Sequence, residues 1–124
     1  MRDFELDIYY ALKKLGARPE LSGYRYIMYA MEVMLNKGDD CIIPVTKELY
    51  PLIAKKFETS SVRVERCIRH CIQDICDHTS LDTLNEVLGE CHNPKLELRY
   101  TNSNFLGLLY NYLRYEVIKE NNNG

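Results

Sequence analysis

Four cationic side chains recur at helical spacing near the middle of this sequence: Arg63, Arg66, Arg69 and His70. Residues three or four positions apart lie on the same face of a helix. An arginine can donate two parallel hydrogen bonds to O6 and N7 of a guanine, and lysine or histidine can contact phosphate without reading sequence. The spacing therefore indicates a helix face that contacts nucleic acid.

The surrounding segment predicts the element that would present this face. It reads TKELYPLIAKKFETSSVRVERCIRHCI from Thr46 to Ile72, which predicts a helix over 52–57, a polar turn over 58–60 and a second helix. This is the layout of a helix-turn-helix, whose second helix enters the DNA major groove. A structural helical hairpin with a solvated basic face has the same pattern, so spacing alone leaves both interpretations open.

The ends and faces of these two helices can also be predicted. Thr46 is a candidate N-cap, and Pro51 should tighten or kink the first turn because it lacks a backbone N–H. Thr59 or Ser60 can cap the second helix. Arg66 lies opposite a stripe that should be buried, formed by Val64, Ile68, Cys71, Ile72 and Ile75.

Helical periodicity covers most of the remaining chain. It predicts helices over 7–15, ended by Gly16, over 24–35 and over 81–88, ended by Gly89. A last helix should begin after Thr101 and turn Phe105, Leu108, Leu109, Tyr112 and Leu113 inward; residues 95–100 could form a brief extended segment. We expect an all-α compact bundle of about six helices containing a helix-turn-helix, in a single domain over 1–120 with a disordered tail over 121–124.

Size and composition fit an ordinary globular domain. The chain has 124 residues, 46% hydrophobic and 27% charged, with a formal charge of −2. The sequence MRDFELDIYY is not a signal peptide and no apolar run is long enough to cross a membrane, which predicts a cytoplasmic protein. The negative total does not argue against DNA, because phosphate attraction depends on local charge.

Metal binding and catalysis have weak support in the sequence. Five cysteines without a secretory context predict reduced thiols, and no CxxC pair is present. The only set worth testing for zinc is Cys76, His78, Cys91 and His92. No phosphate loop, nucleophile elbow or pair of carboxylates suggests an enzyme, so we expect no cofactor and no metal.

Three strings together resemble a known family. VTKELYPLIAKKF, RVERCIRHCI and TNSNFLGLLYNYLRYE are similar to the DNA-binding effector domain of stage zero sporulation protein A, a response regulator of endospore-forming bacteria. The similarity runs from about Leu15 to Glu116. It implies an all-helical fold of six helices and binding to a short asymmetric DNA box, often by tandem domains.

The resemblance also implies roles for individual residues. Arg63, Glu65 and Arg66 fall in the base-reading part of the recognition helix, where glutamate can accept from cytosine N4. Phosphate contacts are expected from Lys56, Ser60, Arg69 and His70. Cys67 and Cys71 replace alanines of the family string, and Val62 replaces a smaller polar residue. The family's receiver domain has no room in 124 residues, so phosphorylation control is not expected here.

Two functional hypotheses follow. In the first, the chain is a transcription regulator that reads double-stranded DNA as a homodimer or tandem dimer and is nucleoid-associated when bound. Alternatively, it is an interaction protein whose last helix pairs with a full-length response-regulator relative and blocks or redirects it. Tyr110, Arg114 and Glu116 are the residues expected to meet such a partner.

Overall fold

The computed structural model is all-α, as the sequence predicts. It describes residues 4–38, 44–89 and 100–118, in which no strand occurs. In chain order the described elements are α1 (Glu5–Lys14), α2 (Ser22–Lys37), the π-helix η2 (Val45–Leu49), α3 (Tyr50–Lys56), α4 (Ser61–His78), α5 (Leu81–Leu88), α6 (Asn102–Asn111) and the π-helix η4 (Tyr112–Ile118). The candidate extended segment and the tail fall almost wholly outside these residues.

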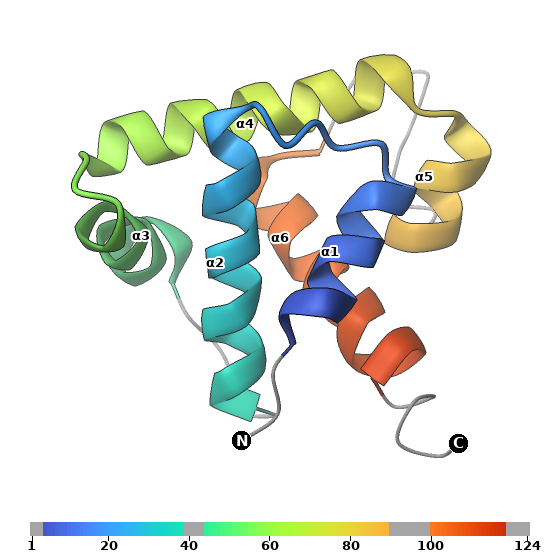
Figure 1. Ribbon diagram of the computed structural model, residues 1–124, viewed down its shortest axis with the longest axis horizontal. Coiled ribbons are helices and arrows are strands. Elements are labelled where there is room, and N and C mark those ends of the chain that lie inside the picture. The colour runs from blue at the N-terminus through green and yellow to red at the C-terminus, as the bar shows by residue number, and fades with distance from the viewer. Residues whose placement is uncertain (1–3, 39–43, 90–99, 119–124) are drawn as a thin grey trace.

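The long helix α4 organises the arrangement. It runs along one side of the molecule, with α3 at its N-terminal end and α5 beyond its C-terminal end (Figure 1). Helix α2 crosses α4 at a steep angle, and α6 packs against both α2 and α4 (Figure 1). The opposite face of α4 is left on the surface, where it can meet a partner.

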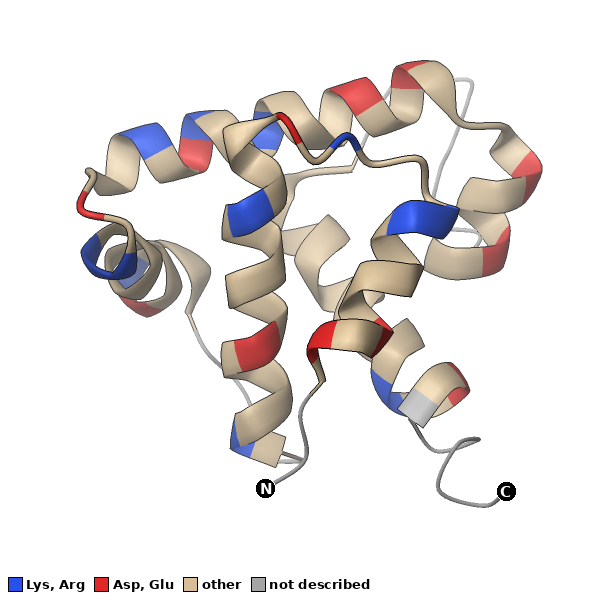
Figure 2. Ribbon diagram, viewed as in Figure 1, with Lys and Arg blue, Asp and Glu red and all other residues tan. Residues whose placement is uncertain are grey.

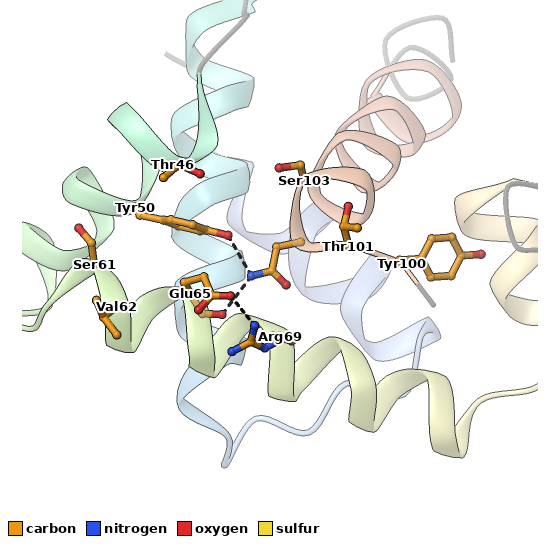
Figure 3. A pocket seen from close by; sticks show the side chains of 10 residues that line it. Thr46, Tyr50, Ser61, Val62, Glu65, Arg69, Tyr100, Thr101 and Ser103 are labelled. Atoms are coloured by element: carbon orange, nitrogen blue, oxygen red, sulfur yellow. Dashed lines mark hydrogen bonds and ion pairs between the residues drawn. The ribbon is translucent and has the colours of Figure 1, made fainter. Parts of the chain in front are cut away.

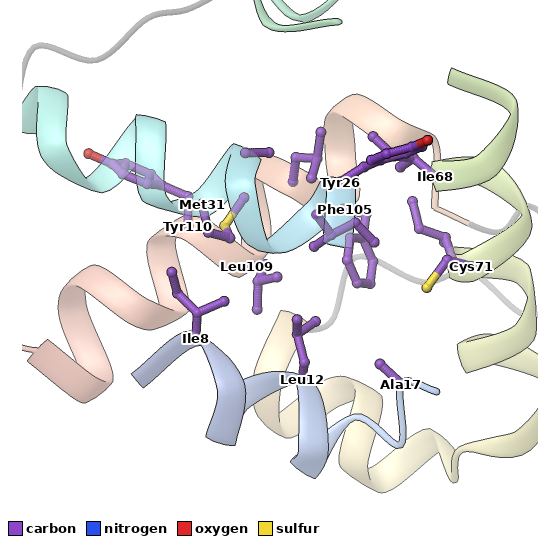
Figure 4. Packing of buried hydrophobic residues seen from close by; sticks show 14 of the residues in the cluster. Ile8, Leu12, Ala17, Tyr26, Met31, Ile68, Cys71, Phe105, Leu109 and Tyr110 are labelled. Atoms are coloured by element: carbon purple, nitrogen blue, oxygen red, sulfur yellow. The ribbon is translucent and has the colours of Figure 1, made fainter. Parts of the chain in front are cut away.

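The core forms where α1, α2, α4 and α6 meet (Figure 4). Phe105 is fully buried there, together with Ile8 and Leu12 of α1 and Met31 of α2. The stripe predicted for α4 is buried along its whole length, in Val64, Ile68, Cys71, Ile72 and Ile75. Fully burying one aliphatic side chain contributes about 1.5–3 kcal/mol, so this shared core fixes how the four helices cross.

The predicted cap at Thr46 needs correction. Thr46 does not cap a helix. The N-cap position belongs to Pro44, whose carbonyl oxygen accepts hydrogen bonds from both Glu48 N–H (2.9 Å) and Leu49 N–H (3.2 Å). The chain therefore enters through the π-turn η2, and Pro51 falls in the first turn of α3, where its missing N–H is tolerated. The tight or kinked turn expected before residue 52 takes this form.

The last helix buries a broader face than predicted. Phe105, Leu109 and Leu113 are buried as expected, but Leu106 and Tyr110 are buried as well, and Leu108 and Tyr112 are only half-buried. Helix α6 packs against α2, α4 and α5, so a single narrow stripe cannot satisfy all its neighbours. At Tyr112 the helix also widens into η4, which changes the face presented by later residues.

Helices α2 and α4 approach each other closely at Gly23. An added Cβ at this position would overlap the backbone carbonyl oxygen of Cys67 and lie 2.7 Å from Cβ of Cys71. Only glycine allows the two backbones to come this near. Because the obstructing atom belongs to the backbone of α4, a rotamer change cannot relieve the overlap.

We predict that Gly23→Ala lowers the free energy of unfolding by about 1–3 kcal/mol, the usual cost of overpacking a well-packed site. Urea denaturation followed by circular dichroism measures this. The control is Gly107→Ala in α6, where an added Cβ meets nothing within 4 Å. That variant should be unchanged or gain about 0.5–1 kcal/mol from helix propensity. Equal effects at the two positions would contradict the close approach.

Candidate nucleic-acid interface

A turn over 57–60 joins α3 to α4, which is the arrangement expected of a helix-turn-helix. Thr59 N–H donates to the carbonyl of Ala54 (2.9 Å), and Glu58 takes a left-handed conformation with φ 54°, which reverses the chain. The turn is held from outside by Phe57, whose ring lies 5.2 Å from that of Tyr26 and 5.9 Å from that of Tyr29. These tilted and edge-to-face contacts anchor the turn against α2.

Ser60, and not Thr59, is the N-cap of α4, so the structure selects one of the two predicted caps. Its Oγ accepts a hydrogen bond from Arg63 N–H at 3.1 Å. Arg63 thus occupies the third helical position, where glutamate would complete a capping box. No acidic residue lies in the first turn of α4. Positive charge near a helix N-terminus is unfavourable for the helix, so this turn is not arranged for helix stability.

The exposed face of α4 is divided by charge. Arg63, Arg66, Arg69 and His70 are all exposed, and Arg66 faces away from the buried stripe. Lys and Arg mark the N-terminal half of α4 and the end of α3, whereas Asp and Glu mark the C-terminal half of α4 and α5 (Figure 2). Lys and Arg are therefore concentrated at the α3–α4 end, with Glu65 among them, in a chain whose formal charge is −2, and further Lys and Arg stand on α1 and α2 (Figure 2).

Glu65 and Arg69 form an ion pair on one flank of this face. Arg69 Nη1 lies 2.8 Å from Glu65 Oε1, and the Glu65 side chain is only 35% exposed. The structure thus joins a residue predicted to read bases with one predicted to contact phosphate. Val62, which departs from the family string, is 64% exposed in the first turn of α4.

Lys56 lies apart from the arginines of α4. Its Nζ is 5.8 Å from the centroid of the Tyr29 ring, in a groove that also contains Glu5 and Glu32. Arg25 approaches the neighbouring Phe57 ring at 6.0 Å. The predicted phosphate contacts are therefore split, with Ser60, Arg69 and His70 on the helix-turn-helix and Lys56 at its junction with α2.

A cavity of about 520 Å³ opens between η2, α3, α4 and the start of α6 (Figure 3). Tyr50 and Asn102 line it and are almost completely buried, with 6% and 9% of their surfaces exposed. The Asn102 carboxamide donates to Tyr50 Oη at 2.9 Å and to the Glu65 carbonyl oxygen at 3.0 Å. Burial raises the pKa of Tyr50, and the hydrogen bond from Asn102 opposes that change.

Comparison with known families agrees with this geometry. The sequence model described as sporulation initiation factor Spo0A C terminal matches residues 8–113. The chain belongs to this family. It therefore carries a DNA-binding effector domain of the kind found in the sporulation regulator, and the Spo0A C-terminal family is a family of DNA-binding domains, not of catalysts. Among the described helices, none is long and apolar enough to cross a membrane.

The predicted partner residues occupy different environments in this Spo0A C-terminal domain. Tyr110 is a core residue, 5% exposed, whose hydroxyl donates to the carbonyl of Gly38 at 2.9 Å. Its ring fills the gap between α2 and α6, so it is not on the surface expected for it. Arg114 is half-buried over the Tyr115 ring, and Glu116 is exposed.

Cysteine and histidine do not form a metal site in the described residues. No group of three or more potential ligands occurs there, and Cys91 and His92 of the candidate zinc set lie outside them. Cys71 is fully buried against α2, and burial raises the pKa of its thiol to about 12. A thiol held neutral in this way acts as a small apolar core residue.

An ion pair joins α4 to the loop before α2, and the sequence analysis did not predict it. Asp74 is 7% exposed and accepts from Arg18 Nη2 at 2.6 Å and from Arg18 Nε at 3.0 Å. The Arg18 hydrogen bonds hold the pKa of Asp74 below its usual range, against the opposing effect of burial. A signal existed, because Asp74 follows Cys71 by three residues and so adjoins the apolar stripe.

We predict that Arg18→Gln lowers the melting temperature most near pH 7 and progressively less in acid. The folded-state pKa of Asp74 lies below the unfolded value of about 3.9, so the pair stabilises the fold above that pH and the effect is lost as the carboxylate is protonated. Thermal melts of both proteins from pH 7 to pH 3 measure the difference. A difference that stays constant to pH 3 would rule out Asp74 as its source.

The control for this prediction is Lys14→Gln, which breaks the ion pair with Glu86. Both of those side chains are largely exposed, at 41% and 60%. Such surface pairs contribute little, about 0–1 kcal/mol. The control should therefore show a smaller change in melting temperature at pH 7 than Arg18→Gln.

Proposed function

We propose that this chain is a transcription regulator that reads a short box in double-stranded DNA by placing α4 in the major groove. The observation that carries the proposal is the charge order of α4. Three arginines stand on the exposed N-terminal half, and the first turn has no acid. This order opposes the helix dipole, whose positive end is the N-terminus. Phosphates and base edges would interact favourably with these arginines and offset the unfavourable interaction with the dipole.

We assign roles to individual residues on the basis of their exposure and spacing. Arg63 and Arg66 are one turn apart and exposed, so both can reach base edges, with guanine O6 and N7 as the preferred acceptors. Ser60, Arg69, His70 and Lys56 are assigned to phosphates. A carboxylate has two acceptor oxygens, so Glu65 can keep Arg69 on Oε1 while Oε2 accepts from a cytosine amino group. Tandem binding of two copies and association with the nucleoid belong to the same proposal.

We predict that Arg66→Ala weakens binding to the box selectively. Losing one bidentate guanine contact should reduce affinity by about 1–3 kcal/mol, or roughly 5-fold to 150-fold, while affinity for a scrambled duplex changes little. Mobility shifts or fluorescence anisotropy on a box-bearing duplex measure this at a fixed salt concentration. Lys13→Ala removes one exposed charge from α1 and serves as the control. Wild-type affinity that tracks salt without sequence preference would defeat the proposal.

We also predict that Arg63→Glu separates stability from binding. Glutamate at this position would complete a capping box with Ser60 and remove an unfavourable charge, which should stabilise the fold by about 0.3–1 kcal/mol. The same change should abolish DNA binding, because it replaces a base-reading guanidinium with an acid inside the negatively charged major groove. Urea unfolding and anisotropy on one preparation give both values. If the variant loses both stability and binding, Arg63 does not favour DNA binding at the expense of helix stability.

A second function is favoured by one observation on the opposite end of the molecule. Helix η4 packs against α1, and both leave large side chains exposed: Tyr115 at 53%, Leu6 at 61% and Tyr10 at 57%. This surface, with Arg114 and Glu116, could meet a full-length relative or a second copy. Co-purification with a receiver-containing relative when no box DNA is present would favour this function over direct DNA reading.

A further inference from the structure

Asn102 occupies the contact between α6 and the two helices of the helix-turn-helix. It is the first residue of α6, directly after Thr101, whose Oγ1 caps the helix by accepting from Asn104 N–H at 3.1 Å. Its carboxamide nitrogen has two hydrogens, and the two acceptors at 2.9 and 3.0 Å belong to α3 and α4 respectively. Both bonds are drawn in Figure 3. One side chain thus bridges three helices.

The chemistry of the acceptors fixes the orientation of the amide. The Glu65 carbonyl oxygen can only accept, so the nitrogen of Asn102, not its oxygen, must face it. Asn102 and Tyr50 are both buried, and a buried polar group that loses its partner has no water molecule to replace the lost hydrogen bond. The bridge is therefore costly to break and directional, unlike an apolar contact, which would tolerate sliding.

The atom bridged on α4 lies inside the segment that faces DNA. Glu65 is flanked in sequence by Val64, which is buried, and by Arg66, which is exposed. A bond to its backbone oxygen holds the main chain at the level of Arg63 and Arg66 without using any side chain of the exposed face. Rotation or axial shift of α4 would move those arginines relative to the base pairs, whereas nonspecific phosphate attraction tolerates small shifts.

We propose that Asn102 is a positioning residue for DNA recognition, which sets the rotation and height of α4 through its bonds to Tyr50 Oη and the Glu65 carbonyl. This rests on the proposed function. Residue 102 touches neither bases nor phosphates in this role and acts through the main chain of α4. Its loss should reduce discrimination between sequences more than it reduces attraction to DNA.

The test compares Asn102→Ala with Asn104→Ala, an exposed asparagine two residues along the same helix. Asn102→Ala should lower affinity for the box-bearing duplex at least tenfold and affinity for a scrambled duplex less than threefold, which shrinks the specificity ratio. Asn104→Ala should leave both affinities within twofold of wild type. All measurements are made below the melting temperature of each variant, so that folded protein is compared with folded protein.

A second measurement does not require DNA. Hydrogen exchange of the free protein should show faster exchange of backbone amides over 63–70 in Asn102→Ala, and a smaller increase in Tyr50→Phe, which removes only one of the two acceptors. Unchanged exchange in this segment, or equal loss of affinity for both duplexes, would overturn the positioning role. If the wild type shows no sequence preference, the proposed function fails, and the exchange measurement alone then decides whether Asn102 holds α4.

Discussion

The close crossing of α2 over α4 is the constraint on which the rest of the structure depends. Gly23 lets the two backbones approach, and the apolar stripe of α4 is then covered along its length by α2, α3 and α6. Because one face of α4 is buried, its opposite face is turned outward by the packing of the core. The Asn102 bridge proposed above then sets the rotation and height of the helix more finely.

Helix α4 shows how a functional face departs from what helix stability favours. At its start, Ser60 satisfies a backbone N–H, but Arg63, at the third helical position, is cationic where an acid would be favourable. Towards its other end, Asp74 is held by Arg18, so the acid there has its own partner. The N-terminal half is thus arranged for an anion that is not part of the chain, while packing and capping keep the helix folded.

The sequence predicted those features of the fold that depend on helical periodicity and on the ends of individual helices. The buried faces of α1 and α4, the glycine-terminated helix α5 and the cap at Ser60 follow from spacing and from local hydrogen bonding, both of which act within a few residues. The π-turn at Val45 and the broad face of α6 did not follow, because they depend on which other helices surround them. Tyr50 and Glu65 lie 52 and 37 residues from Asn102 along the chain, so no local pattern marks that bridge.

The residues that differ from the family string lie on two sides of α4: the cysteines on the packed side and Val62 on the exposed side. Cys71 lies on the side of Gly23, where a small side chain is required, and Cys67 is partly covered there as well. A cysteine satisfies that space much as alanine does, so these two changes leave the DNA-facing surface as it was. Val62 is different, since it is exposed in the first turn, beside Arg63. An apolar side chain there offers contact to a thymine methyl group but no hydrogen bond, so any shift in box preference should arise at Val62 and not at the cysteines.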